Sequence, residues 1–187
     1  MCSYFNYYYP QVREVTDGSK DSEEPTNASS IYEFSARNID HKNISLSSYK
    51  PSVSLIVNVT SSKGSLSVKN YKGLAELNSR HAKRGLRILL FPCNQFGNED
   101  AGIAADVKKH HLPEGMQFEL FAKTEVNGTR AHGLFRYLKS ALSRKQVKGN
   151  FEKWLVGKNG VPVKWYESKA DPLSLENDII AELDKTN

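Results

Sequence analysis

The segment from Leu86 to Gly97 constrains the fold of this chain more than any other stretch. It reads Leu-Arg-Ile-Leu-Leu-Phe-Pro-Cys-Asn-Gln-Phe-Gly, and its first half is almost uninterrupted apolar sequence. A short apolar run predicts a strand that is covered on both faces, as in a parallel or mixed sheet between helices. Pro92 has no amide hydrogen for a sheet ladder, so we expect the strand to end there. Polar residues then follow at the carboxyl end of the strand, where open α/β sheets usually place their sites.

The rest of the pattern predicts one α/β domain built around this strand. Val53–Val59 is a second apolar run, and apolar residues at helical spacing over 71–81 lie between the two runs, which predicts a strand–helix–strand unit. Gly85 follows two basic residues and is a helix-stop signal. Further strands are expected at 31–36, 44–47, 116–121, 151–156 and 161–166, and further helices at 103–111, 134–142 and 175–183. Asn159-Gly160 is a hairpin signal between the last two strands.

Length and composition favour a single globular domain with a polar tail. The chain has 187 residues, of which 39% are hydrophobic and 25% charged. Asp17–Ser30 is rich in Ser, Asp, Glu, Thr and Asn and has no apolar period. We therefore predict a disordered N-terminal extension over residues 1–30 and a folded domain over 31–187.

Charge and cysteine content limit the classes of partner and compartment. The formal charge is +5, and the first thirty residues hold two basic and five acidic residues, which leaves +8 for the remainder. A basic surface can attract anionic thiols, phospholipid head groups or nucleic acid, but a solvated basic surface is the simpler interpretation. Cys2 and Cys93 do not make a disulfide scaffold. No apolar stretch approaches the ~20 residues of a membrane span, and no secretory signal is evident. We expect a cytoplasmic protein without a metal site and without specific nucleic-acid binding.

Phe91–Gly97 resembles the signature of the glutathione peroxidase family, which has a thioredoxin-like fold. Other segments that resemble the family follow in the same order: Val57–Val59, Asn70–Leu74, Val126–Gly128, Ala131–His132, Asn150–Phe151, Pro162–Lys164 and Pro172–Leu173. The resemblance covers roughly residues 31–183 and implies a central mixed sheet with helices on both faces. The short Ser143–Asn150 connection is similar to that of the monomeric branch that reduces phospholipid hydroperoxides. The resemblance thus implies a monomer, a lipid hydroperoxide as substrate, and glutathione or thioredoxin as reductant.

The resemblance also implies where the reacting sulfur would be. In the family, a thiolate or selenolate follows the first core strand, and Gln, Trp and Asn side chains donate hydrogen bonds toward it. Aligned from Asn58, the nucleophile position falls on Lys63; aligned backward from Tyr71, it falls on Gly64, because this loop is one residue longer. The Gln, Trp and Asn positions fall on Glu99, Gly149 and Asn150. Three of the four family site residues are therefore expected to be replaced.

These replacements are unfavourable for thiol chemistry. Lysine cannot run a sulfenic-acid cycle, an ionised Glu99 accepts but does not donate hydrogen bonds, and Gly149 lacks the indole N–H. If Lys63 occupies the sulfur position, we expect it to approach Glu99 within salt-bridge range and fill the site.

Cys93 leaves two functional hypotheses open. It is either a relocated nucleophile or a small, buried, inert residue at a strand end, and the second interpretation is favoured because the family signature contains this cysteine apart from its nucleophile. The favoured hypothesis is a family member that has lost or greatly weakened hydroperoxide reduction and acts by binding or regulation. The alternative is an active thiol-dependent hydroperoxide reductase of the oxidative-stress response that uses Cys93. Neither needs a bound cofactor.

Overall fold

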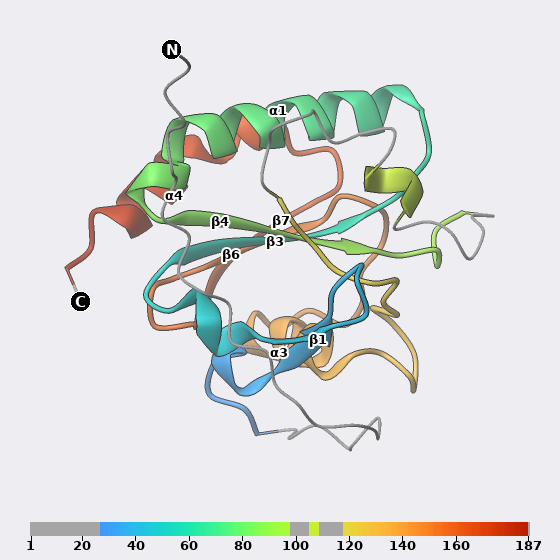
Figure 1. Cartoon of the computed structure of the whole chain (residues 1–187), viewed down its shortest axis with the longest axis horizontal. Helices are drawn as coiled ribbons and strands as arrows, with labels where there is room; N and C mark the ends of the chain where they lie inside the picture. Colours follow the sequence, from blue (N-terminus) through green and yellow to red (C-terminus); the bar gives the residue numbers. More distant parts are fainter. Residues whose placement is uncertain (1–26, 98–104, 109–117, 187) are drawn as a thin grey trace, which may run out of the picture.

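The structure, a computed structural model, describes residues 27–97, 105–108 and 118–186 (Figure 1). The strands are β1 (Ser35–Arg37), β2 (Asn43–Ser45), β3 (Val53–Val59), β4 (Leu86–Pro92), β5 (Glu119–Leu120), β6 (Lys153–Val156) and β7 (Pro162–Tyr166). The α-helices are α1 (Ser65–His81), α3 (Gly133–Ala141) and α4 (Glu176–Leu183), and residues 105–108 are also helical. Short 3₁₀ helices span Ile31–Glu33, Leu46–Tyr49, Ala82–Arg84 and Pro172–Leu175.

The central sheet is mixed, as predicted. Its strand order is β5-β4-β3-β6-β7. Strands β3, β4 and β5 run parallel, whereas β6 is antiparallel to β3 and β7 is antiparallel to β6. Strand β4 ends at Pro92, which lies opposite Val59 at the end of β3. The expected strand–helix–strand unit is therefore confirmed as β3–α1–β4.

Each face of the sheet packs on its own hydrophobic core. Leu55 and Val57 of β3 face the core formed with α1 and α4, whereas Ile56 between them faces the core formed with α3. Figure 1 shows α1 and α4 on one side of the sheet, and α3 with the β1–β2 hairpin on the other. Because both faces are covered, the central strands are apolar at most positions, which is why their sequences show no regular alternation.

The predicted N-terminal strands are partly wrong. Ile31–Glu33 forms a 3₁₀ helix instead of a strand, and the strand begins only at Ser35. Likewise, Leu46 starts a 3₁₀ helix, so that strand ends at Ser45. A Ser30–Glu33 capping box stabilises the first of these turns, which a pattern of apolar residues does not reveal.

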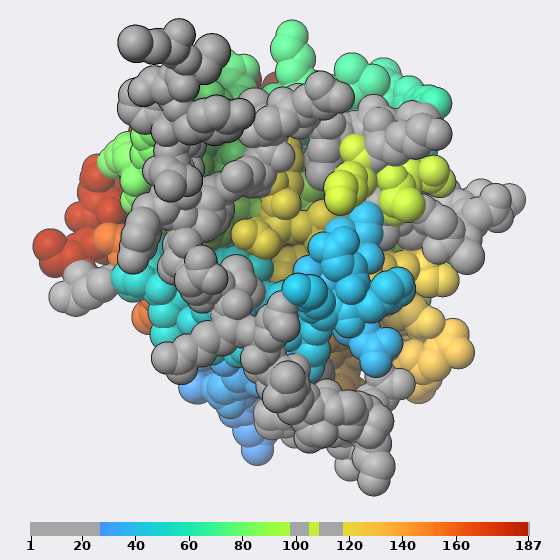
Figure 2. Space-filling view, in the orientation of Figure 1, coloured from blue at the N-terminus to red at the C-terminus, as the bar shows by residue number. Residues whose placement is uncertain are grey.

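The β1–β2 hairpin lies beside β5 outside the central sheet. Asn38 forms a bridge with Phe121, and the Ile39 amide donates to the Leu120 carbonyl at 3.2 Å. In Figure 2 the blue residues of this hairpin lie against the yellow residues of the β5 region. The expected strand over 116–121 is described only from 118 and is regular at Glu119–Leu120. Of the expected helix over 103–111, only 105–108 lie within the described residues.

The described chain makes contacts before residue 31. Ala28 packs against the core on the α3 side, and the Tyr137 hydroxyl donates to the Ser29 carbonyl at 2.8 Å. Residues 1–26 lie outside the described part, so the predicted disorder of the extension remains a prediction. Within the residues the structure describes, no helix has the length and apolarity needed to cross a membrane.

Candidate functional site

Three segments meet at the carboxyl edge of β3 and β4. The Cys93 amide donates to the Val59 carbonyl at 2.9 Å, which keeps the ends of the two parallel strands together. The Phe151 amide donates to the Asn58 carbonyl at 2.7 Å, which brings the start of β6 to the same edge. The segments after β3, after β4 and before β6 are therefore neighbours, as the sequence predicted for a site at this edge.

The loop after β3 carries the two candidate nucleophile positions. The Ser62 amide donates to Thr60 Oγ1 at 3.2 Å, and the Gly64 amide donates to Ser62 Oγ at 3.4 Å. These local bonds form a turn that leads into α1, whose N-cap is Gly64. Lys63 and Gly64 are both exposed. Under either alignment, the position at the helix N-terminus is open to solvent and bears no thiol.

The segment before β6 is held by Asn58, a fully buried side chain of β3. Its Nδ2 donates to the Gly149 carbonyl, and its Oδ1 accepts from the Glu152 amide, both at 3.0 Å. Between these two bonds Phe151 adopts a left-handed conformation with φ 64°, which is uncommon for a bulky residue and requires support from its surroundings. Asn150 Oδ1 is enclosed and accepts no hydrogen bond from a described residue. Asn58 thus fixes Gly149 and Asn150 at the edge of the sheet.

A second buried side chain, Lys153 at the start of β6, holds the segment before β6. Its side chain is fully buried, and Nζ donates to the carbonyls of Phe151 at 2.7 Å, Ala170 at 2.9 Å and Ser168 at 3.5 Å. Burial lowers the pKa of the Lys153 ammonium to about 8, although the negative charges of Asp171 and Glu152 act in the opposite direction. One ammonium therefore ties the segment before β6 to the loop after β7.

Gly149 lies against that second loop. A β-carbon built on Gly149 would be 2.8 Å from Ser168 Oγ, closer than real contacts allow. A tryptophan at this position would therefore require the Ser168 side chain to move. The Ser168 hydroxyl thus occupies the space that a side chain at position 149 would enter.

Cys93 occupies the same edge but lies inside the protein. It is fully buried in the core on the α3 side, and its Sγ lies 3.7 Å from Gln95 Oε1. Gln95 Oε1 also accepts from the amides of Val126 at 2.8 Å and Asn127 at 3.0 Å. Gln95 thus fastens the loop before α3, and the buried position of Cys93 beside Gln95 fits a structural role for the cysteine.

Some predicted site residues cannot be placed, and some important residues were not predicted. Glu99 and Cys2 lie outside the described residues, so the expected approach of Lys63 to Glu99 stays a prediction. Sequence reasoning missed the roles of Asn58 and Lys153. The available signal was an amide or ammonium side chain inside a mostly apolar strand, since burial of such a group without partners is costly.

Comparisons with known proteins agree with this fold. A sequence model of the glutathione peroxidase family matches residues 31–139. A glutathione peroxidase of Schistosoma mansoni is 42% identical over 160 residues, which cover 83% of this chain and 94% of the relative. A phospholipid hydroperoxide glutathione peroxidase of Bos taurus is 40% identical over 157 residues, which cover 81% of this chain and 79% of the relative.

Solved structures extend the comparison to three dimensions. The crystal structure of T. cruzi GPX1 is similar with a TM-score of 0.67 at 31% identity, covering 82% of this chain and 96% of that one. A thioredoxin family thiol:disulfide interchange protein from Chlorobium tepidum TLS is 12% identical, with a TM-score of 0.60 over 80% of this chain and 92% of its own. The second likeness establishes the thioredoxin-like fold. The family match, the identity of the curated relatives and the shared fold together show that this chain belongs to the glutathione peroxidase family.

Proposed function

We propose that this chain has lost ordinary hydroperoxide reduction and acts by binding. The observation that carries the proposal is the chemistry of the residues after β3. Lys63 and Gly64, the two candidate nucleophile positions, are exposed and have no sulfur. The one cysteine among the described residues, Cys93, is fully buried. A thiol peroxidase needs an accessible thiolate, and the described part of the chain offers none.

The segment before β6 is firmly held at the same edge of the sheet. The Asn58 and Lys153 hydrogen bonds still hold Asn150 at the sheet edge. A scaffold that persists without its nucleophile supports a role that uses the shape and charge of the surface instead of sulfur chemistry.

A turnover assay tests this proposal directly. The purified chain is given hydrogen peroxide or a lipid hydroperoxide together with glutathione or thioredoxin, and consumption of the peroxide is followed. We expect no turnover above the rate without protein. Robust turnover that disappears in Cys93→Ser would establish the alternative, a hydroperoxide reductase that uses Cys93.

Thiol labelling tests the same alternative without a substrate. In a Cys2→Ser background, Cys93 should react slowly with a thiol reagent in the native state and rapidly after denaturation, because its side chain is fully buried. Fast native labelling would contradict the structural role of Cys93.

Restoration of the site is the more demanding experiment. Lys63→Cys alone should give little activity, because a carboxylate at Glu99 would raise the pKa of the new thiol. Adding Glu99→Gln and Gly149→Trp should raise activity, and the tryptophan should be accepted better when Ser168→Gly removes the side chain beside it. Full turnover in Lys63→Cys alone would contradict our explanation of the loss.

The relatives suggest what such a protein binds. The bovine relative is named for phospholipid hydroperoxide, and we propose lipid hydroperoxides or an anionic thiol as ligand classes for this chain. We also propose that the protein is cytoplasmic. We propose a monomer because the Ser143–Asn150 connection is short, as in the monomeric branch that the sequence resembles. Size-exclusion chromatography with light scattering checks the oligomeric state, and a dimer or tetramer would contradict it.

A further inference from the structure

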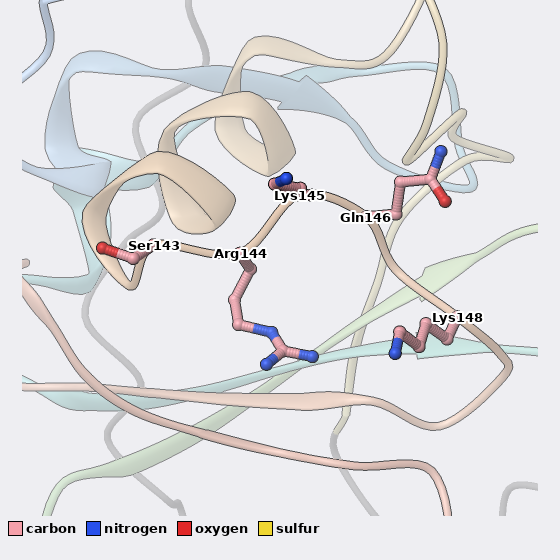
Figure 3. Close-up of a pocket in the computed structure, with 5 residues that line it drawn as sticks. All are labelled: Ser143, Arg144, Lys145, Gln146 and Lys148. Atoms are coloured by element: carbon pink, nitrogen blue, oxygen red, sulfur yellow. The ribbon is translucent and has the colours of Figure 1, made fainter.

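A basic pocket of about 650 Å³ opens on the connection between α3 and β6. Its lining residues are Ser143, Arg144, Lys145, Gln146 and Lys148. Three of these five side chains are cationic and none is acidic, so the pocket has a strongly positive character. Figure 3 shows the Arg144 and Lys148 side chains extending from the loop in the same direction. We call residues 143–148 the basic loop.

The charge of the basic loop is not balanced by neighbouring acids. Lys145 and Lys148 are exposed, and neither forms an ion pair with a described residue. On the α1 side of the sheet, by contrast, several cationic side chains have acidic partners: Lys69 with Asp171, Arg80 with Glu176, and Arg84 with Asp184. The basic loop therefore offers positive charge that the described part of the chain does not use.

The basic loop is also held in a fixed shape, which lowers the cost of binding a second segment. The Arg144 guanidinium carbon lies 3.6 Å from the centre of the Trp165 ring, and the Lys148 amide donates to Glu152 Oε1 at 2.6 Å. Trp165 Nε1 donates to the other Glu152 oxygen at 2.8 Å. Because Glu152 is 2% exposed, this carboxylate supports the loop from inside and presents no acidic group in the pocket.

The described chain begins close to this loop. The Tyr137 hydroxyl on α3 donates to the Ser29 carbonyl at 2.8 Å, and Ala28 packs against the core on the α3 side. The basic loop starts just after α3, which ends at Ala141, so Ser143 lies roughly 9 Å beyond Tyr137 at about 1.5 Å per residue. An extended chain spans about 3.3 Å per residue. Residues shortly before Ala28 can therefore reach the basic loop.

The sequence places an acidic segment within that reach. Residues 17–24 read Asp-Gly-Ser-Lys-Asp-Ser-Glu-Glu, with four acidic residues and one basic residue. This segment lies outside the described residues, and its sequence contains no aliphatic or aromatic side chain. Burial of apolar surface therefore cannot attach it to the domain, whereas its negative charge complements the basic loop. Glu24 is separated from Ser29 by about 17 Å of extended chain at most.

We propose that residues 17–24 bind the basic loop of the same chain as an intramolecular acidic ligand. Each exposed ion pair is weak by itself, but a short tether gives an effective concentration of roughly millimolar, which favours several weak contacts made together. The bound segment neutralises part of the positive surface and lowers its affinity for other anionic partners. The inference goes beyond the proposed function and does not depend on whether the chain retains turnover.

Paramagnetic broadening of backbone amide signals tests this contact in the full chain. A nitroxide is attached to Ser22→Cys in a Cys2→Ser background, in which Cys93 is fully buried and stays unlabelled. At about 0.1 M salt we expect strong broadening of the amides of residues 143–148. Raising the salt to about 1 M shortens the screening length from about 10 to about 3 Å and should remove most of this broadening.

A neutral segment of the same length separates the effect of charge from that of tethering. Its four substitutions should remove most of the broadening: Asp17→Asn, Asp21→Asn, Glu23→Gln and Glu24→Gln. On the other side of the contact, Lys145→Gln combined with Lys148→Gln should reduce the broadening severalfold. The matched control is Lys72→Gln combined with Lys108→Gln, which removes two exposed charges on the α1 side of the sheet. This control should leave the broadening unchanged.

The inference would be overturned if the wild-type segment did not broaden the amides of residues 143–148, or if the neutral segment or high salt left the broadening unchanged. Equal reductions by the two pairs of lysine substitutions would also overturn it. These measurements need no substrate, and the turnover assay needs no label. A negative result here would thus remove the intramolecular contact without affecting the proposed loss of catalysis.

Discussion

The two loops that meet at the carboxyl edge of the sheet are held in opposite ways. The segment before β6 is fixed by buried side chains of two strands, Asn58 and Lys153, which together make five hydrogen bonds to backbone groups. The loop after β3 is exposed, and the hydrogen bonds described above within it are made by its own hydroxyl groups. One loop is part of the core, whereas the other lies at the surface.

This difference means that the residues needed for stability are not the residues that would carry the reaction. Loss of a buried amide or ammonium leaves its backbone partners without hydrogen bonds, so a change at Asn58 or Lys153 should destabilise the fold. At exposed positions such as Lys63 and Gly64 a different side chain is tolerated, and replacement of a nucleophile there need not disturb the fold. The proposed loss of the reaction at the residues after β3 is therefore compatible with a preserved family fold.

The largest effect is expected at Lys153. Lys153→Met removes an ammonium that serves three carbonyls, and it should lower the free energy of unfolding by about 3 kcal/mol at pH 7. Urea denaturation measures this loss. Lys72→Met on the exposed face of α1 is the control and should change stability little. A comparable loss in both variants would contradict the role of Lys153 as an anchor.

The difference in unfolding free energy between the wild type and Lys153→Met should also depend on pH. The folded pKa of Lys153, about 8, is below its ordinary value of 10.5. Between these values the unfolded chain binds more protons, so the contribution of Lys153 to stability rises with pH and is flat below pH 8. The difference between wild type and Lys153→Met should widen by up to roughly 3 kcal/mol from pH 8 to 10.5. A constant difference would contradict the lowered pKa.

Asn58 should show a somewhat smaller effect. Asn58→Ala leaves the Gly149 carbonyl and the Glu152 amide without their partner, so a loss of about 2 kcal/mol is expected in urea denaturation. Ser54→Ala is the matched control on the same strand, since Ser54 is also fully buried but its hydroxyl has no partner among the described residues. That control should be nearly neutral, and equal losses would show that burial alone matters.

Gly149 and Ser168 should be energetically coupled. Gly149→Ala places a methyl group 2.8 Å from Ser168 Oγ and should destabilise the protein by about 1 kcal/mol. Because Ser168→Ala removes that oxygen, the double variant should recover most of the loss, as a double-mutant cycle can measure. Strictly additive changes in the unfolding free energy would show that the side chains at positions 149 and 168 do not interact.

The smallest effect is expected at Lys63. Lys63→Ala should change the free energy of unfolding by less than about 1 kcal/mol, because the residue is exposed. A loss of roughly 3–5 kcal/mol would show instead that Lys63 and Glu99 form an enclosed ion pair that fills the site. Thermal unfolding of Lys63→Ala and Glu99→Gln separates these outcomes. A large loss of stability would show that the loop after β3 is also held by an enclosed interaction, which would contradict the contrast between the two loops.

Local sequence patterns alone specify the central strands and most of the helices. The apolar runs at β3 and β4 have to be buried on both faces, Pro92 has to end a strand, and the periodic residues of α1 have to face a core, so these elements follow from local patterns. The signature at Phe91–Gly97 further identified the family. Sequence also predicted a candidate site where the carboxyl ends of parallel strands meet, and the structure brings the segments after β3 and β4 together there.

The polar residues that hold that edge, and the groups that are accessible there, follow from contacts between segments that are distant in the sequence. Asn58, Lys153 and Gln95 find their partners on distant segments, and Arg144 meets Trp165 across the β6–β7 hairpin. The sequence analysis favoured a buried Cys93 at the strand end, and the core on the α3 side does enclose it. Burial and long-range hydrogen bonds depend on how distant segments pack together, so local periodicity of the sequence does not predict them.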